Sequence, residues 1–288
     1  MELIKFDKVA RLGRRALRKR QAVAKFPDIA QDKLPILFAN SFPKSGTHLL
    51  TQILAGFTNL APFSVAGLAP VRSFEGETGE LRDPQLLKQE INQLLPGDIS
   101  YGHVLAYPET VKLLVGNGMA AFFIFRDPRD VVVSHVHYVT DINAKHVHHE
   151  YYTRNLVDFD QRLETSIRGL PEAENPFPDI GNRFAGYVPW LDEDDIYSLR
   201  FEELVEQPNK TVSHIHQFLA KRGFISQYSS HEIEKTLLKG IDPQQSPTFR
   251  SGKTGAWRES FSPKHKEIFK GVAGNLLIEL GYEENQNW

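Results

Sequence analysis

Residues 43–47, Pro-Lys-Ser-Gly-Thr, contain the groups that bind a phosphate-like anion. Lys44 supplies a mobile cation, and the hydroxyls of Ser45 and Thr47 supply hydrogen-bond donors. If Gly46 turns the chain into a helix, the first N–H groups of that helix point outward and its dipole favours negative charge. A Walker A loop, GxxxxGKS/T, is excluded because Lys44 precedes Gly46. We therefore predict a site for a phosphate-like group at these residues.

Two further places in the sequence have side chains suited to group transfer. His103 lies at the end of a short predicted strand, and a histidine can act as a general base near neutral pH. Arg126 offers a planar guanidinium fork that suits a phosphate, and Ser134, eight residues later, could share that phosphate. The charged residues between them are assigned to helix capping and surface ion pairs: Asp127, Arg129 and Asp130.

Each of these groups lies at or just after the end of a predicted strand. Leu37–Ala39, Asp98–Leu105, Met119–Phe125 and Asp195–Phe201 are expected to be buried strands, and Thr47–Gly56 has the apolar spacing of a helix. Ligands of open α/β sheets bind at the carboxyl ends of the strands, so we expect the groups to meet there. The prediction is a single α/β domain over residues 31–288. It has a central, mostly parallel, five-stranded sheet flanked by helices, similar to P-loop NTPases, and it follows a basic helix or extension at residues 1–30.

Three strings, taken in order, resemble the motifs of one enzyme family. PKSGT resembles the 5′-phosphosulfate loop PKSGTT, and RDPRDVVVSHVHY resembles the 3′-phosphate motif R-N/D-P-K/R-D-x-x-x-S. Residues 249–263 resemble the segment RKGxxGDWKxxFT. From about residue 36 to 270 the chain therefore resembles the cytosolic type of PAPS-dependent sulfotransferase. That resemblance implies transfer of a sulfuryl group from 3′-phosphoadenosine 5′-phosphosulfate (PAPS) to a small-molecule hydroxyl or amine, with no metal.

The resemblance also implies a role for individual residues. Lys44 would stabilise the leaving 5′-phosphate, His103 would be the general base, and Ser134 would assist at the 3′-phosphate; these three are the expected catalytic residues. The residues expected to bind the donor are Lys44, Ser45, Gly46, Thr47, His48, Arg126, Ser134, Phe201, Arg250, Ser251 and Gly252.

The sequence departs from the family motifs at five positions. Leu49 replaces the tryptophan that stacks on adenine, so adenine must be held otherwise or more weakly. His48 replaces the second threonine of the loop, and Tyr101 replaces the lysine of K-x-H. Ser251 and Ala256 replace the lysine of RKG and the aspartate of GDW. The lysine, histidine and arginine that the chemistry requires are all retained.

Composition excludes several classes of protein. The 288 residues carry a net charge of −2, so no strong field attracts nucleic acid, and none is expected as a partner. There is no cysteine, which excludes disulfides, thiolate metal sites and cysteine nucleophiles. The longest apolar run, residues 119–125, is far below the ~18 residues of a membrane helix. A soluble, cytoplasmic protein is expected.

The first 25 residues contain nine basic and two acidic residues, a net charge of +7. On a helix, the apolar residues gather near one face, opposite much of the charge. Such a helix is a candidate for peripheral contact with an anionic membrane or an acidic partner. The favoured interpretation is a terminal helix packed on the domain with a solvated basic face. The apolar residues concerned are Leu3, Phe6, Val9, Ala10, Ala16 and Leu17.

Two other functions stay open. Asp127 after an apolar strand could mimic a Walker B carboxylate, which would make the chain a P-loop nucleotide kinase or NTPase. The second open function is that of a domain without catalytic activity, which would use its basic N-terminal helix to dock on a membrane or a partner. Five histidines at residues 135–149 are assigned to an acceptor entrance or to solvent rather than to zinc, because their spacing suits a metal poorly. The acceptor and the oligomeric state are open.

Overall fold

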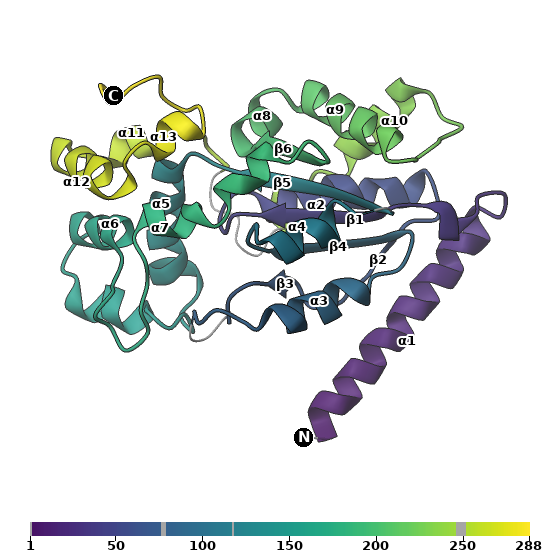
Figure 1. Cartoon of the computed structure of the whole chain (residues 1–288), viewed down its shortest axis with the longest axis horizontal. Coiled ribbons are helices and arrows are strands. Elements are labelled where there is room, and N and C mark those ends of the chain that lie inside the picture. Colours follow the sequence, from purple (N-terminus) through teal and green to yellow (C-terminus); the bar gives the residue numbers. More distant parts are fainter. Residues whose placement is uncertain (1, 76–78, 117, 246–251) are drawn as a thin grey trace.

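A computed structural model describes residues 2–75, 79–116, 118–245 and 252–288 of the chain. Its centre is a six-stranded sheet in the order β2-β4-β1-β5-β6, with β3 pairing with β4 (Figure 1). Every pairing between these strands is parallel, which confirms the predicted parallel α/β sheet. The predicted number of five strands is wrong, because the two-residue strands β2 and β3 both pair with β4. The strands are β1 (Ile36–Ser41), β2 (Ser64–Val65), β3 (Val71–Arg72), β4 (Asp98–His103), β5 (Met119–Phe125) and β6 (Ile196–Arg200).

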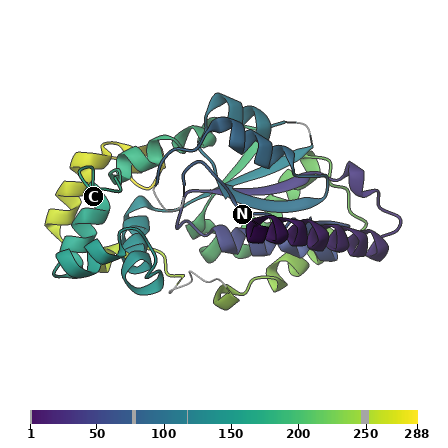
Figure 2. The ribbon, with the colours of Figure 1, turned by 90° about the horizontal axis from the view of Figure 1, so that it is seen from below.

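Helices cover both faces of the sheet (Figures 1 and 2). They are α1 (Glu2–Lys25), α2 (Thr47–Gly56), α3 (Pro84–Asn92), α4 (Pro108–Leu114), α5 (Pro128–His137), α6 (Phe159–Arg168), α7 (Ile180–Ala185), α8 (Phe201–Glu206), α9 (Pro208–Lys221), α10 (Ser230–Lys239), α11 (Trp257–Ser260), α12 (Pro263–Ala273) and α13 (Leu276–Glu279). Short 3₁₀ turns are η1 (Gln31–Lys33), η2 (Phe57–Asn59), η5 (Val188–Asp192) and η6 (Pro243–Gln245), and π-helical turns are η3 (Tyr138–Ile142) and η4 (Tyr151–Asn155).

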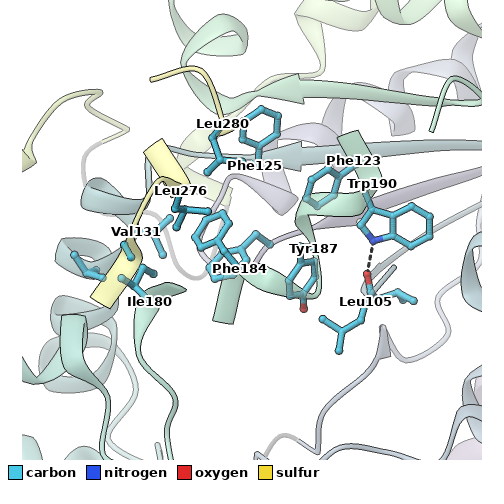
Figure 3. Close-up of a cluster of buried hydrophobic side chains, with 14 of the residues drawn as sticks. Leu105, Phe123, Phe125, Val131, Ile180, Phe184, Tyr187, Trp190, Leu276 and Leu280 are labelled. Carbon is cyan, nitrogen blue, oxygen red and sulfur yellow. Dashed lines mark hydrogen bonds between the residues drawn. The ribbon is translucent and has the colours of Figure 1, made fainter. Parts of the chain in front are cut away.

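The two faces have separate apolar cores because side chains alternate along each strand. Phe122 of β5 packs in the core shared with α2, α9 and α10, whereas Phe123 packs in the core shared with α3 to α7 and α12. In the second core the indole Nε1 of Trp190 donates to the carbonyl of Val104 at 2.8 Å (Figure 3). Asn40 also bonds Val104, so the backbone directly after β4 is held on two sides.

Helix α1 runs from the β2 edge of the sheet away from the rest of the chain (Figure 1). It is attached through its basic side chains: Arg15 forms an ion pair with Asp98, and Arg18 donates to the carbonyls of Val65 and Ala66 at 2.8 and 2.9 Å. The predicted contact with the domain is therefore confirmed. The predicted solvated basic face is correct for Arg11, Arg14, Arg20 and Lys25, which are exposed, and wrong for Arg15, which is buried. Large apolar side chains of α1 are exposed as well: Leu12, Leu17 and Val23.

The described helices include none that is long and apolar enough to cross a bilayer.

Candidate functional site

The predicted strand, loop and helix at residues 36–56 are present. β1 ends at Ser41, residues 42–46 turn, and α2 begins at Thr47. Lys44 has φ +69°, the left-handed region, which costs a non-glycine residue roughly 1–2 kcal/mol. Gly46 has φ +95°, and a Cβ there would lie 2.5 Å from Cδ2 of Phe201. Left-handed backbone at a non-glycine residue is typical of binding sites, where the surroundings enforce it.

The loop presents donors that the protein itself does not use. Ser45 is fully buried, and its Oγ has no hydrogen-bond partner among the described residues. No side chain caps the N-terminus of α2, where Gly46 stands at the N-cap. Thr47 differs, since its Oγ1 lies 2.6 Å from Oγ of Ser41. Buried donors without partners cost free energy, so this loop is built for an acceptor-rich ligand such as a phosphate.

Lys44 is a cation without a carboxylate partner. Its Nζ lies 3.9 Å from the ring centroid of Tyr138, and it forms no ion pair with any described residue. Burial, together with the nearby charge of Arg126, lowers the pKa of Lys44 to about 8. Tyr138 was not identified from the sequence; it begins the π-helical turn that follows α5, and such turns are frequent at functional sites.

His103 lies at the carboxyl end of β4, beside β1, as predicted. Its Nδ1 is 3.0 Å from the carbonyl oxygen of Ser41 and 3.0 Å from Oγ of the same residue. A carbonyl only accepts, so Nδ1 carries the hydrogen and Nε2 is the nitrogen with a free lone pair. Burial lowers the pKa of His103 to about 4, with further lowering by the charges of Arg72, His48 and Lys44. The imidazole is therefore neutral near pH 7.

Arg126 follows β5 and lies where three segments meet. Its Nη2 donates to the carbonyl of Lys253 at 2.7 Å and lies 3.4 Å from Oδ2 of Asp130. Its guanidinium carbon is 4.6 Å from the ring centroid of Phe201, the same ring that packs against Gly46. Nε of Arg126 is buried and has no partner within the described residues. The guanidinium of Arg126 therefore keeps one N–H donor, that of Nε, available to a ligand.

Ser134 lies two turns along α5 and is half-buried. It is four residues beyond Asp130, so both occupy the same side of the helix. The segment resembling the family's third motif begins outside the described residues, where Arg250 and Ser251 lie. Gly252 is described and has φ +60°.

Asp127, Arg129 and Asp130 are buried, at 5%, 1% and 1% exposure, so the predicted surface pairing is wrong. Asp127 caps α5 as predicted, but its carboxylate also binds the Arg129 guanidinium, which stacks on Trp257 at 3.8 Å.

Asp130 holds the segment that follows Gly252. Its two carboxylate oxygens accept hydrogen bonds from the backbone N–H groups of Gly255, at 2.8 Å, and Trp257, at 2.9 Å. This contact joins the Arg126 motif to the third motif. Nothing in the sequence indicated it, because its two partners are 125 and 127 residues away along the chain.

The remaining predicted residues take up different positions. The ring of His48 is 6.3 Å from that of Tyr101, and burial followed by the charge of Lys44 lowers the pKa of His48. Leu49 packs against the core shared with α2, α9 and α10.

The predicted solvation of the histidines is wrong for two of them. His135 and His148 are buried, and the ring of His135 stacks on Phe177 at 4.7 Å. Among the described residues, no group of three or more histidine or acidic residues is placed to hold a metal ion.

Comparison with known proteins gives three related findings. Residues 121–281 match the model of the sulfotransferase domain family. A flavonol sulfotransferase-like protein of Flaveria bidentis is 21% identical over 275 residues, which are 85% of this chain and 82% of the relative. Its similarity extends beyond the residues of the family match.

Two solved structures share the fold. The mouse sulfotransferase SULT7A1 complexed with PAP has a TM-score of 0.58 and 18% identity, over 89% of this chain and 92% of its own. A retinol dehydratase in complex with androsterone and inactive cofactor PAP has a TM-score of 0.55 and 14% identity, over 90% and 85%. The predicted resemblance of fold is confirmed.

Proposed function

This chain belongs to the sulfotransferase domain family, and from that membership we propose how its own residues perform sulfuryl transfer. The donor is PAPS, and the acceptor is a small molecule with a hydroxyl or amine. The observation that carries the proposal is the convergence of unpartnered donors from separate segments. Oγ of Ser45 and Nε of Arg126 are buried without partners, and Lys44 has no carboxylate, among the described residues. A nucleotide with anionic groups at both its 5′ and 3′ ends satisfies all three.

The two ends of the donor are assigned to two groups of residues. The loop N–H groups, Lys44 and Ser45 hold the 5′-phosphosulfate, by the helix N-terminus geometry described above. Arg126 and Ser134 hold the 3′-phosphate, and Arg250, Ser251 and Gly252 are assigned to the same phosphate. Phe201 supports both ends, because its ring contacts Gly46 and lies under the Arg126 guanidinium. Both solved structures are complexes with PAP, 3′-phosphoadenosine 5′-phosphate, which supports this assignment.

In the reaction, the bond from sulfur to the acceptor oxygen forms as the bond from sulfur to the 5′-phosphate oxygen breaks. The donor supplies the sulfuryl group and leaves as PAP. Lys44 and the loop N–H groups stabilise negative charge that grows on the leaving phosphate, and this preorganised stabilisation is the largest expected contribution. Thr47 Oγ1, already 2.6 Å from Ser41 Oγ, fixes the loop against β1.

His103 takes the proton of the acceptor on Nε2. Its tautomer supports this role: Nδ1–H donates to the Ser41 carbonyl at 3.0 Å, which leaves Nε2 as the acceptor of a proton. Its pKa of about 4 keeps the imidazole neutral at pH 7 but also makes it a weak base, so negative charge from the bound ligands must assist its protonation. His103→Gln is expected to abolish turnover and to leave PAP affinity unchanged; loss of both would remove His103 from this role.

The kinase alternative loses its main support. Both carboxylate oxygens of Asp127 are occupied by Arg129, and the same carboxylate caps α5, so it is not available to a magnesium ion. Thermal shifts with PAP, ADP and ATP–Mg²⁺ test this choice. Saturation at one hundred times Kd adds about 2.7 kcal/mol to the free energy of unfolding. We expect stabilisation by PAP that is lost in Arg126→Ala; an equal shift with ATP–Mg²⁺ would restore the kinase alternative.

We propose two further properties that the sequence suggested. Helix α1 contacts an anionic membrane surface peripherally, and the exposure of Leu12, Leu17 and Val23 supports this. Sedimentation with phosphatidylserine vesicles tests it: replacing these three residues by serine should abolish binding. The location is cytoplasmic, as the lack of cysteine suggests, and cell fractionation checks it.

A further inference from the structure

The two-residue strand β3 aligns Arg72 with His103. The β3–β4 pairing is parallel, with Val71 opposite Gly102 and Arg72 opposite His103. Aligned residues of parallel strands extend to the same face of a sheet, so the guanidinium and the imidazole rise side by side. β4 lies between β3 and β1. The strand β3, which carries Arg72, and the strand β1, which leads into the Lys44 loop, therefore lie on opposite sides of His103.

Arg72 is held in this position by several contacts. The N–H of Ser73 donates to the carbonyl of His103 at 3.0 Å, and Nη1 of Arg82 donates to the carbonyl of Arg72 at 2.9 Å. β3 approaches so closely that a Cβ on Gly102 would lie 2.4 Å from the carbonyl oxygen of Val71. The glycine that precedes His103 is thus what allows β3 to pack there.

No described carboxylate neutralises Arg72. Two acidic side chains of the neighbouring segments, Glu75 and Glu90, both pair with Arg82, at 3.0 and 2.7 Å. The Arg72 side chain itself is exposed and has no ion pair in the part of the chain that the structure describes. The groups that act on His103 from the other side, Lys44 and His48, are also basic. A cation beside a general base opposes its protonation unless an anion lies between them.

We propose that Arg72 binds an anionic group of the acceptor, so that the preferred acceptors are hydroxyl compounds that also carry a carboxylate, phosphate or sulfate. The inference rests on the proposed function and adds the class of substrate. A guanidinium binds such groups through two parallel hydrogen bonds, which also fixes the orientation of the acceptor. The reacting hydroxyl then lies toward Nε2 of His103, and the anion lies beyond it.

The test uses matched acceptors that differ only in charge: 4-hydroxybenzoate, 4-hydroxyphenylacetate and 3-(4-hydroxyphenyl)propanoate, each with its primary amide. Turnover with PAPS is measured for each pair, and binding to the protein–PAP complex is measured by calorimetry. The variants are Arg72→Gln and Arg72→Lys. Arg168→Gln is the control, because it removes an exposed arginine that pairs with Glu164 on α6.

Wild-type protein should prefer at least one carboxylate over its amide, and Arg72→Gln should weaken that carboxylate about 10- to 100-fold, the usual effect of hydrogen bonds to a charged group. The amide and the Arg168→Gln control should be unchanged, and Arg72→Lys should retain part of the preference. Equal binding of acid and amide in the wild type would overturn the inference. The inference would also be overturned if Arg72→Gln lowered kcat equally for the acid and the amide, because Arg72 would then act on the sulfuryl group and not on the anion of the acceptor. Failure of PAP to bind would instead refute the proposed function.

Discussion

Asp130→Asn tests the link between Arg126 and the segment after Gly252. The native carboxylate accepts from Gly255 N and Trp257 N and lies 3.4 Å from Nη2 of Arg126. An asparagine has nearly the same shape but only one oxygen. In either orientation its NH₂ group faces one of the two backbone N–H groups, and the charge opposite Arg126 is lost.

The magnitude follows from these contacts. A hydrogen bond to a charged group contributes about 1.5–3 kcal/mol, which corresponds to about 10- to 100-fold in an equilibrium constant. Trp257 is buried, so Oδ1 of the asparagine is expected to keep that bond and the Gly255 bond is lost. Gly255 is half-buried and its N–H can reach water, so no large additional penalty is added. We expect PAP affinity to fall about 10- to 100-fold, because both the fork and the segment are held less firmly.

Calorimetric titration with PAP and with ADP measures the effect. The loss should be confined to PAP, since ADP lacks the 3′-phosphate that these elements are proposed to bind. Asp83→Asn is the matched control: Asp83 caps α3 by accepting from Gln85 N at 2.8 Å, and it is exposed and outside the site. Wild-type affinity for PAP in Asp130→Asn, or an equal loss for ADP, would refute the reasoning.

Three further outcomes are expected. Gly46→Ala should lower the free energy of unfolding by about 2–5 kcal/mol in urea, from left-handed strain and the 2.5 Å contact with Phe201. Gly118→Ala, with φ +85° but nothing within 4 Å, should cost less, and equal losses would contradict the packing argument. PAP affinity should fall as the pH rises above about 8, where Lys44 loses its proton, and Lys44→Met should remove that dependence. The kcat/KM should show no acid limb near pH 6.5, because His103, with its pKa of about 4, is protonated only at lower pH; a limb at 6.5 that His103→Gln abolishes would contradict this.

Local sequence was sufficient for the elements of the donor loop. Apolar residues, then a glycine turn, then apolar residues at helical spacing define a strand, loop and helix within twenty residues. His103 and Arg126 each stand at the carboxyl end of a predicted strand. Because the carboxyl ends of parallel strands lie at one edge of a sheet, the sequence also predicted that the two residues share that edge. At the C-terminal end of the chain, the apolar pattern alone does not show where one helix ends and the next begins. Gly274, with φ +55°, ends α12, and a separate helix α13 follows.

The sequence by itself therefore indicated which residues carry the proposed chemistry: Lys44 in a loop, His103 at a strand end, and Arg126 with Ser134 eight residues later. Tertiary structure alone decided how these groups are supported. Phe201 lies between Gly46 and Arg126, Asp130 binds backbone 125 residues away, and α1 docks through its charges rather than its apolar side. Spacing along the chain specifies which residues share a strand or a helix face. Contacts between distant segments depend on how the helices and loops pack on the whole sheet, and no local sequence pattern encodes this packing.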